Sequence, residues 1–213
     1  MDIIKNVKDK IEGKHIKIVF PEGEDLRILN ATSRLQEEGI IHPILLGDVD
    51  EIKKVASENG LDISKLEILD IKNYEEKDLL LKSLEERRAG KNTKEECEEM
   101  LKIPNYFGTM LVHTGKASGL VSGAVNSTGD TVRPALQIIK TKPGISRTSG
   151  AMLMLGPNEE QYLFADFAIN IELDASQLAE VAICSAETAK LFGLDPKVAM
   201  LSFSTKGSAK HDF

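Results

Sequence analysis

The sequence predicts an α/β protein in which largely parallel sheets are flanked by helices. Short apolar runs alternate along it with longer stretches whose apolar residues recur at helical spacing. The apolar runs are almost continuous, as in Ile16–Phe20, which is typical of strands buried on both faces of a parallel sheet. With 213 residues, of which 41% are hydrophobic and 29% charged, the chain can form a large core without disulfides or a metal.

The front half of the sequence is expected to hold three strands among several helices. Residues 1–11 alternate lysines with apolar residues and are predicted as a helix. Asp25–Glu38 is predicted as a second helix, which Gly39 ends. The segment 71–102 balances basic against acidic residues, which indicates solvated helices rather than a binding tail. The other predicted elements are strands over 16–20, 40–46 and 66–71 and a helix around 50–59.

The rear half is predicted to cross a domain boundary. A strand over 119–125 leads to a helix over 130–139, with Pro134 in the first helical turn. Lys142-Pro143-Gly144 then interrupts the pattern, which predicts a first domain over 1–143 and a second over 144–213. The remaining predicted elements are strands over 150–155, 162–169 and 198–204 and a helix over 175–192. Because the sequence stops before the crossover that normally follows such a strand, we expect it to be the front portion of a longer protein.

Charge and cysteine content exclude several classes of function. The 27 basic against 34 acidic residues give a formal net charge of −7, which is unfavourable for nucleic-acid binding. No window of about 18 apolar residues and no leader-like start are present, so neither a membrane span nor secretion is predicted. Cys97 and Cys184 lie far apart without a CxxC motif, and the four histidines are scattered. This pattern favours free thiols in a reducing cytoplasm and no metal site.

The most informative segment is Gly123–Pro134, where small hydroxyl residues separate a predicted strand from a predicted helix. Free N–H groups at the start of a helix favour an anion. Ser127 and Thr128 add hydroxyl donors, and Arg133, expected in the first turn, adds a planar fork that fits phosphate or carboxylate. The same residues are ordinary helix-capping chemistry, so their spacing leaves both an anion site and a plain cap open.

Two further segments carry donors for a polyanionic ligand. Ser146, Arg147 and Thr148 stand beside the predicted domain boundary, where an inter-domain linker is the alternative. Lys206 follows the last predicted strand, at the position where ligands of open α/β sheets bind, and a simple turn is the alternative.

Other motifs point away from competing chemistries. Residues 21–25 carry three carboxylates that would repel a phosphate, so they are predicted as a loop and helix cap with Arg27 as a partner. No GxGxxG follows a strand and no GxSxG occurs, which argues against dinucleotide oxidoreduction and triad hydrolysis.

Four segments together resemble a known family: FPEGEDLR (20–27), the long block 119–150, ADFAIN (165–170) and residues 189–210. They resemble the phosphate acetyltransferase family, through essentially the whole sequence. The resemblance implies two α/β domains around a cleft, similar to isocitrate and isopropylmalate dehydrogenases, with the second domain incomplete here. It also implies a homodimer that interconverts acetyl-CoA and phosphate with acetyl phosphate and CoA. CoA would be a co-substrate, with no tightly bound cofactor.

The resemblance assigns roles residue by residue. It implies that Arg133 is the catalytic arginine of the cleft and that Ser127 and Thr128 belong to a phosphate loop. It implies that Arg87 binds CoA, although a charge on a solvated helix is the alternative. The base and a Ser-Arg pair of the family belong to a C-terminal motif that this sequence does not contain. Several members carry a cysteine in the ADC motif, whereas Ala165-Asp166-Phe167 offers no thiol.

Three functions therefore remain in comparison. The first is direct attack of the CoA thiolate on acetyl phosphate, with phosphate butyryltransferase as a close alternative and with the activity of this chain alone left open. The second is a non-catalytic acyl-CoA sensing module, like the domains fused to some malic enzymes. The third is a dehydrogenase on the related fold, which the missing nicotinamide motif disfavours.

Overall fold

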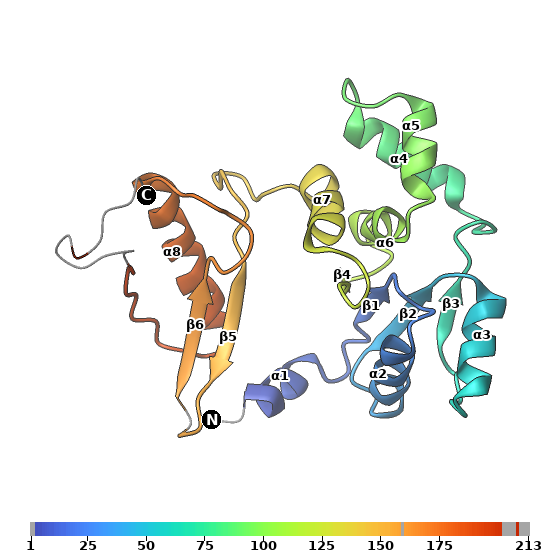
Figure 1. Cartoon of the computed structure of the whole chain (residues 1–213), viewed down its shortest axis with the longest axis horizontal. Coiled ribbons are helices and arrows are strands. Elements are labelled where there is room, and N and C mark those ends of the chain that lie inside the picture. Colours follow the sequence, from blue (N-terminus) through green and yellow to red (C-terminus); the bar gives the residue numbers. More distant parts are fainter. Residues whose placement is uncertain (1–2, 159, 202–207, 209–213) are drawn as a thin grey trace. The chain divides into compact units, whose positions relative to one another are not determined.

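The chain divides into two compact units in a computed structural model that describes residues 3–158, 160–201 and 208. The first, which we call the sheet unit, comprises Lys8–Lys140. The second, the hairpin unit, comprises Met1–Val7 and Thr141–Phe213. Figure 1 shows the ribbon of both units along the sequence.

The sheet unit is built on four parallel strands in the order β3-β2-β1-β4. Parallel pairing confirms the α/β class that the continuous apolar runs predict. The strands are β1 (Lys17–Phe20), β2 (His42–Leu46), β3 (Glu67–Leu69) and β4 (Gly119–Leu120).

Helices cover both faces of this sheet (Figure 1). In β2, Leu45 packs with α2 and α3, whereas its neighbours Ile44 and Leu46 pack with α4 to α7. The alternation follows from strand geometry, because successive side chains point to opposite faces. The helices are α2 (Leu26–Glu37), α3 (Val49–Glu58), α4 (Lys77–Arg88), α5 (Lys94–Leu101), α6 (Pro104–His113) and α7 (Thr128–Ile138).

Helix α6 is the element that sequence periodicity does not reveal. It is apolar on nearly every side and has six buried residues, so it lacks the polar stripe of a surface helix. Gly108 lets it approach the sheet, since a Cβ there would lie 2.7 Å from Leu120 Cδ1 and 3.0 Å from Val19 Cγ1.

The segment predicted as strand 119–125 and helix 130–139 differs from the structure in two respects. Strand β4 ends at Leu120, and α7 starts at Thr128, so Pro134 and Arg133 lie in the second helical turn rather than the first. Pro134 has no N–H for the carbonyl of Asp130 four residues before it. The buried Asn105 of α6 donates to that carbonyl at 3.2 Å, which explains how a proline inside the helix is accommodated.

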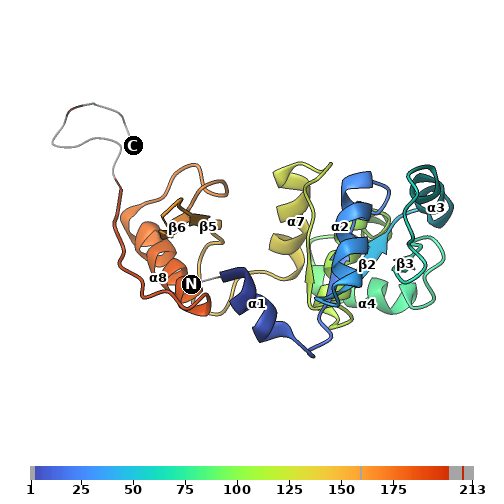
Figure 2. The ribbon, with the colours of Figure 1, turned by 90° about the horizontal axis from the view of Figure 1, so that it is seen from below.

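The hairpin unit contains an antiparallel pair, β5 (Ala151–Leu155) and β6 (Gln161–Ala165). This differs from the expectation of parallel sheets, because the short connection over 156–160 cannot form the long crossover of a parallel pair. Figures 1 and 2 place α8 (Ala175–Leu191) along the hairpin, in agreement with its packing on β6. Helix α1 (Ile3–Ile11) runs across the change of unit.

Two strand predictions in the hairpin unit need correction. The strand predicted over 162–169 ends at Ala165, because Asp166 turns the chain with its own hydrogen bonds. Within the strand predicted over 198–204, residues 198–201 are not in a strand, and the rest lies outside the described residues.

Candidate functional site

The candidate site lies at the carboxyl ends of β1 and β4. The connection that leaves β1 packs on one face of the sheet, and the connection that enters β4 packs on the other. Such a point, where the connections diverge, opens a crevice in which α/β proteins bind ligands. Residues 21–25 follow β1 and residues 121–127 follow β4, so the fold places both segments at this edge.

The buried carboxylate of Glu22 organises the loop after β4. Its Oε2 accepts the N–H groups of Gly123 at 3.1 Å and Ala124 at 2.9 Å. Its Oε1 accepts those of Val125 at 2.8 Å and Asn126 at 2.7 Å, together with the Asn126 side-chain amide at 2.8 Å. Glu22 is only 8% exposed. Burial alone would raise its pKa, but the backbone hydrogen bonds outweigh it and hold the pKa below the ordinary value.

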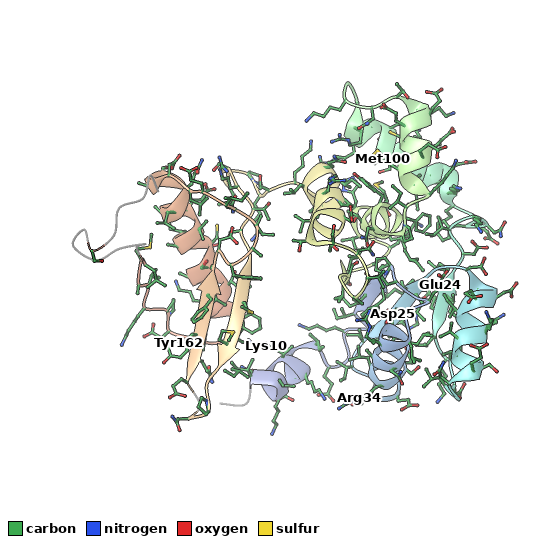
Figure 3. All side chains as sticks on the ribbon, viewed as in Figure 1. Lys10, Glu24, Asp25, Arg34, Met100 and Tyr162 are labelled. Atoms are coloured by element: carbon green, nitrogen blue, oxygen red, sulfur yellow. The ribbon has the colours of Figure 1, made fainter. Side chains whose placement is uncertain are left out.

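The sequence predicts residues 21–25 as a loop and helix cap with Arg27 as a partner. Asp25 confirms this prediction, which does not include the hydrogen bonds of Glu22 to the loop after β4. Asp25 caps α2 by accepting the N–H of Arg27 at 2.8 Å, and it pairs with the Arg27 guanidinium at 2.7 Å. Arg27 also donates to the carbonyl of Ala124 at 2.7 Å, so a second side chain secures the loop. Figure 3 labels Glu24 and Asp25, which continue the chain towards α2.

The first turn of α7 carries the donors that remain for an external anion. Ser127 is the N-cap: its hydroxyl accepts the N–H of Asp130 at 3.2 Å and donates to the Asp130 carboxylate at 2.6 Å. Within the described part of the chain, the N–H groups of Thr128 and Gly129 have no hydrogen-bond partner. The cap and the anion-binding interpretations of this segment therefore coexist, since the cap satisfies only some of the free N–H groups.

Arg133 extends over this same turn. Its Nη1 lies 3.9 Å from Asp130 Oδ1, and its side chain is 60% exposed. Its Nη2 lies 3.7 Å from the position where Gly129 would carry a Cβ, so the guanidinium reaches back to the helix start. The structure thus brings Ser127, Thr128 and Arg133 together. Asp130 balances the charge of Arg133 without enclosing it, which leaves guanidinium donors open to solvent and to an anion.

Arg87 lies elsewhere. From α4 it donates through Nε to the carbonyl of Ile138 and through Nη2 to that of Ile139 at 2.9 Å. These carbonyls end α7, at the opposite end of the helix from Ser127. An 11-residue helix is about 16 Å long, so the structure does not bring Arg87 to the same cluster of donors.

Ser146, Arg147 and Thr148 belong to the hairpin unit. The backbone N–H and hydroxyl of Ser146 both donate to the carboxylate of Glu180 on α8, whereas Arg147 is exposed. The carbonyl of Thr148 accepts the side-chain amide of Asn170 at 2.9 Å. Lys206 lies outside the described residues.

A second carboxylate, Asp166, binds backbone N–H groups of the hairpin unit, as Glu22 does in the sheet unit. It accepts the N–H groups of Gly150, Ala168 and Ile169 at 3.1 Å and that of Asn170 at 2.8 Å. Burial would raise its pKa, but these hydrogen bonds outweigh it and bring the pKa to about 2.

Sequence reasoning missed the roles of both carboxylates. Each stands just beyond the end of a strand, Glu22 after Phe20 and Asp166 after Ala165. That position is the one signal that could have indicated them.

A cavity of about 370 Å³ lies beyond the end of β3 and before α4. It is distinct from the cluster at the start of α7, and its acidic lining does not suit an anion. In the described part of the chain, no three His, Cys, Asp or Glu side chains are grouped to hold a metal ion, and no helix is long and apolar enough to cross a membrane. The cavity is lined by Ile68, Leu69, Asp70, Asn73, Tyr74, Glu75 and Glu76.

Comparison with known proteins places this geometry in context. Residues 2–213 match the family described as "Phosphate acetyl/butaryl transferase". The chain is 60% identical over 211 residues to a phosphate acetyltransferase of Staphylococcus epidermidis, covering 99% of the chain and 64% of that relative. The solved EutD phosphotransacetylase from Staphylococcus aureus superposes with a TM-score of 0.89 at 57% identity, and a phosphotransacetylase from Streptococcus pyogenes with 0.90 at 52%. Each alignment covers 99% of the chain and 64% of the solved protein, so the chain spans less than two thirds of the relatives it matches.

Proposed function

Since the chain belongs to the phosphate acetyl/butyryl transferase family, we propose that it carries the phosphate-binding part of an acyltransferase. The proposed reaction interconverts acetyl-CoA and phosphate with acetyl phosphate and CoA. The observation that supports the proposal is the cluster at the start of α7. There, two N–H groups that have no partner among the described residues, the hydroxyls of Ser127 and Thr128 and the guanidinium of Arg133 lie at the carboxyl edge of a parallel sheet.

The chemistry needs such a cluster. The thiolate of CoA attacks the carbonyl carbon of acetyl phosphate, a C–S bond forms, and the C–O bond to phosphate breaks, so that inorganic phosphate leaves. Negative charge develops first on the carbonyl oxygen and then on the departing phosphate. Donors held in advance by a helix start and a guanidinium stabilise that charge without reorganising. In this scheme Arg133 is the catalytic residue, and Ser127 and Thr128 bind the phosphate. Ser127 then donates to the phosphate the hydroxyl proton that it gives to the Asp130 carboxylate in the free protein.

Other residues are proposed to bind the substrates. Ser146, Arg147, Thr148 and Lys206 are candidate donors to the phosphate groups. Arg87 is proposed to contact CoA. Its guanidinium has five N–H donors, of which the carbonyls at the end of α7 use two. The same side chain can therefore hold α7 and meet an anion.

We also propose the broader setting of the reaction. CoA acts as a co-substrate rather than a resident cofactor, the protein is a homodimer, and two free cysteines fit a cytoplasmic location. The name of the family covers acetyl and butyryl substrates, which differ by two methylene groups. Each methylene contributes only about 1–3 kcal/mol of discrimination, so the sequence does not decide between the two substrates. Comparison of the rates with acetyl phosphate and butyryl phosphate separates these alternatives.

The test combines phosphate binding with thioester formation. Inorganic phosphate is titrated calorimetrically into the chain, and acetyl-CoA formation is followed in a version extended with the remaining third of the Staphylococcus epidermidis relative. We expect Arg133→Ala to reduce acetyl-CoA formation by about 2–3 kcal/mol in transition-state terms and to weaken phosphate binding. Arg34→Ala is the matched control, because Arg34 is 81% exposed near the end of α2.

Three outcomes are informative. Unchanged kinetics in Arg133→Ala would remove the catalytic role. Binding of CoA by the extended protein without any turnover would favour the acyl-CoA sensing module. Reduction of a nicotinamide cofactor with a hydroxy acid would favour the third alternative, a dehydrogenase.

A further inference from the structure

The backbone N–H groups of the loop that leads from β4 to α7 converge on one side chain. Between the end of β4 and the cap of α7, the N–H groups of Gly123, Ala124, Val125 and Asn126 all point to the Glu22 carboxylate, at 2.7–3.1 Å. Glu22 enters from β1, more than a hundred positions earlier in the chain. The direction in which α7 leaves the sheet is therefore tied to a carboxylate that lies just beyond the end of the neighbouring strand β1.

This arrangement decides where an external anion can bind. Successive backbone N–H groups that converge on one point form a cavity for an anion. Here Glu22 already fills that cavity with two carboxylate oxygens and five hydrogen bonds. A phosphate cannot use these N–H groups, so the donors that remain for it in this segment are those of the first turn of α7 and Arg133.

We propose that Glu22 is a positioning residue of the phosphate site. It aligns the start of α7 with Arg133 and keeps the substrate phosphate out of the loop 123–126. This inference rests on the proposed function, but it concerns a residue that touches neither phosphate nor CoA. A merely structural Glu22 would affect the stability of the protein and leave the phosphate affinity of the folded molecule unchanged.

The experiment titrates inorganic phosphate into the folded chain and three variants. In Glu22→Gln, an NH₂ group replaces one acceptor oxygen and opposes the donors of the loop. We expect phosphate to bind about tenfold more weakly or worse in this variant. In Glu22→Ala, the vacated cavity fits formate, so added formate should recover most of the lost affinity. Glu24→Gln is the control: it removes one charge from the same segment, and its amide oxygen can still accept the N–H of Asp48, so its phosphate affinity should stay within about twofold.

The outcomes separate this inference from the proposed function. A wild-type chain that does not bind phosphate contradicts both. A wild-type chain that binds, with Glu22 variants of equal affinity, overturns the positioning role alone. A loss of phosphate affinity in Glu22→Ala that added formate does not restore would also contradict the positioning role.

Amide hydrogen exchange of the wild-type chain serves if both Glu22 variants fail to fold. We expect protection at Gly123–Asn126, and rapid exchange at these four amides would overturn the proposal.

Discussion

Replacement of Arg87 by alanine tests whether this side chain holds α7 in place. The change removes two hydrogen bonds from a charged donor to the carbonyls of Ile138 and Ile139. A hydrogen bond to a charged group contributes about 1.5–3 kcal/mol, and the lower value applies because water reaches this partly exposed end of the helix. The cation also loses a favourable position at a helix C-terminus, worth about 0.5 kcal/mol. Together these terms predict that the free energy of unfolding falls by about 3–4 kcal/mol.

Urea unfolding followed by circular dichroism measures this loss. Lys82→Ala is the control, since Lys82 is exposed on the same helix, and it should change stability by less than about 0.5 kcal/mol. Arg87→Lys should give an intermediate loss, because an ammonium cannot reach both carbonyls with a planar fork. A loss below about 0.5 kcal/mol in Arg87→Ala would refute the reasoning. A weaker CoA affinity in the folded variant would show that the remaining donors also meet the substrate.

Three further predictions follow from the geometry. Gly23→Ala should destabilise the protein by about 2 kcal/mol or more in thermal unfolding, because its Cβ would lie 2.6 Å from a backbone oxygen of β2. In Gly129→Ala the new Cβ would have its nearest contacts at 3.7 Å and 3.8 Å, so this variant should be neutral or stabilising. Equal losses of stability in Gly23→Ala and Gly129→Ala would contradict this account. The pKa of Asp166 is lowered from 3.8 to about 2, so its contribution of about 2–2.5 kcal/mol is present above pH 4 and is lost as the pH falls towards 2. In the wild-type chain, the free energy of unfolding measured at several acidic pH values should fall between about pH 4 and pH 2. If the same fall persists in Asp166→Asn, another group causes it. Burial raises the pKa of the Cys97 thiol, so a thiol reagent should modify Cys184 first and Cys97 only on unfolding, and rapid reaction of both thiols in the folded chain would contradict the burial.

The predictable part of the fold depends on residues that are neighbours in the sequence. Asp25 and Gly39 frame α2 because a side-chain acceptor starts a helix and a residue at φ +65° ends it. The long helix α8 follows its apolar spacing and ends at Leu191, one residue before the predicted end. The parallel sheet is visible in advance because strands buried on both faces need continuous apolar runs.

The unpredicted part depends on partners that are distant in the sequence. Local sequence places Pro134 in a first turn, but Asn105 from another helix donates to the carbonyl that the proline leaves without a partner within its own helix. Helix α6 escapes prediction because burial on nearly all sides removes the polar stripe by which a helix is identified.

The site shows the same division. Sequence alone determines that hydroxyls, glycines and an arginine precede and open one helix, since that chemistry lies within a dozen consecutive residues. Only the tertiary structure decides which anion those residues can hold. Glu22, more than a hundred positions away, accepts the loop's N–H groups, so the phosphate that we propose can use only the N–H groups of the first turn of α7 in this segment. The physical reason is that a buried N–H must find an acceptor, and the fold rather than the local sequence brings that acceptor within 3 Å.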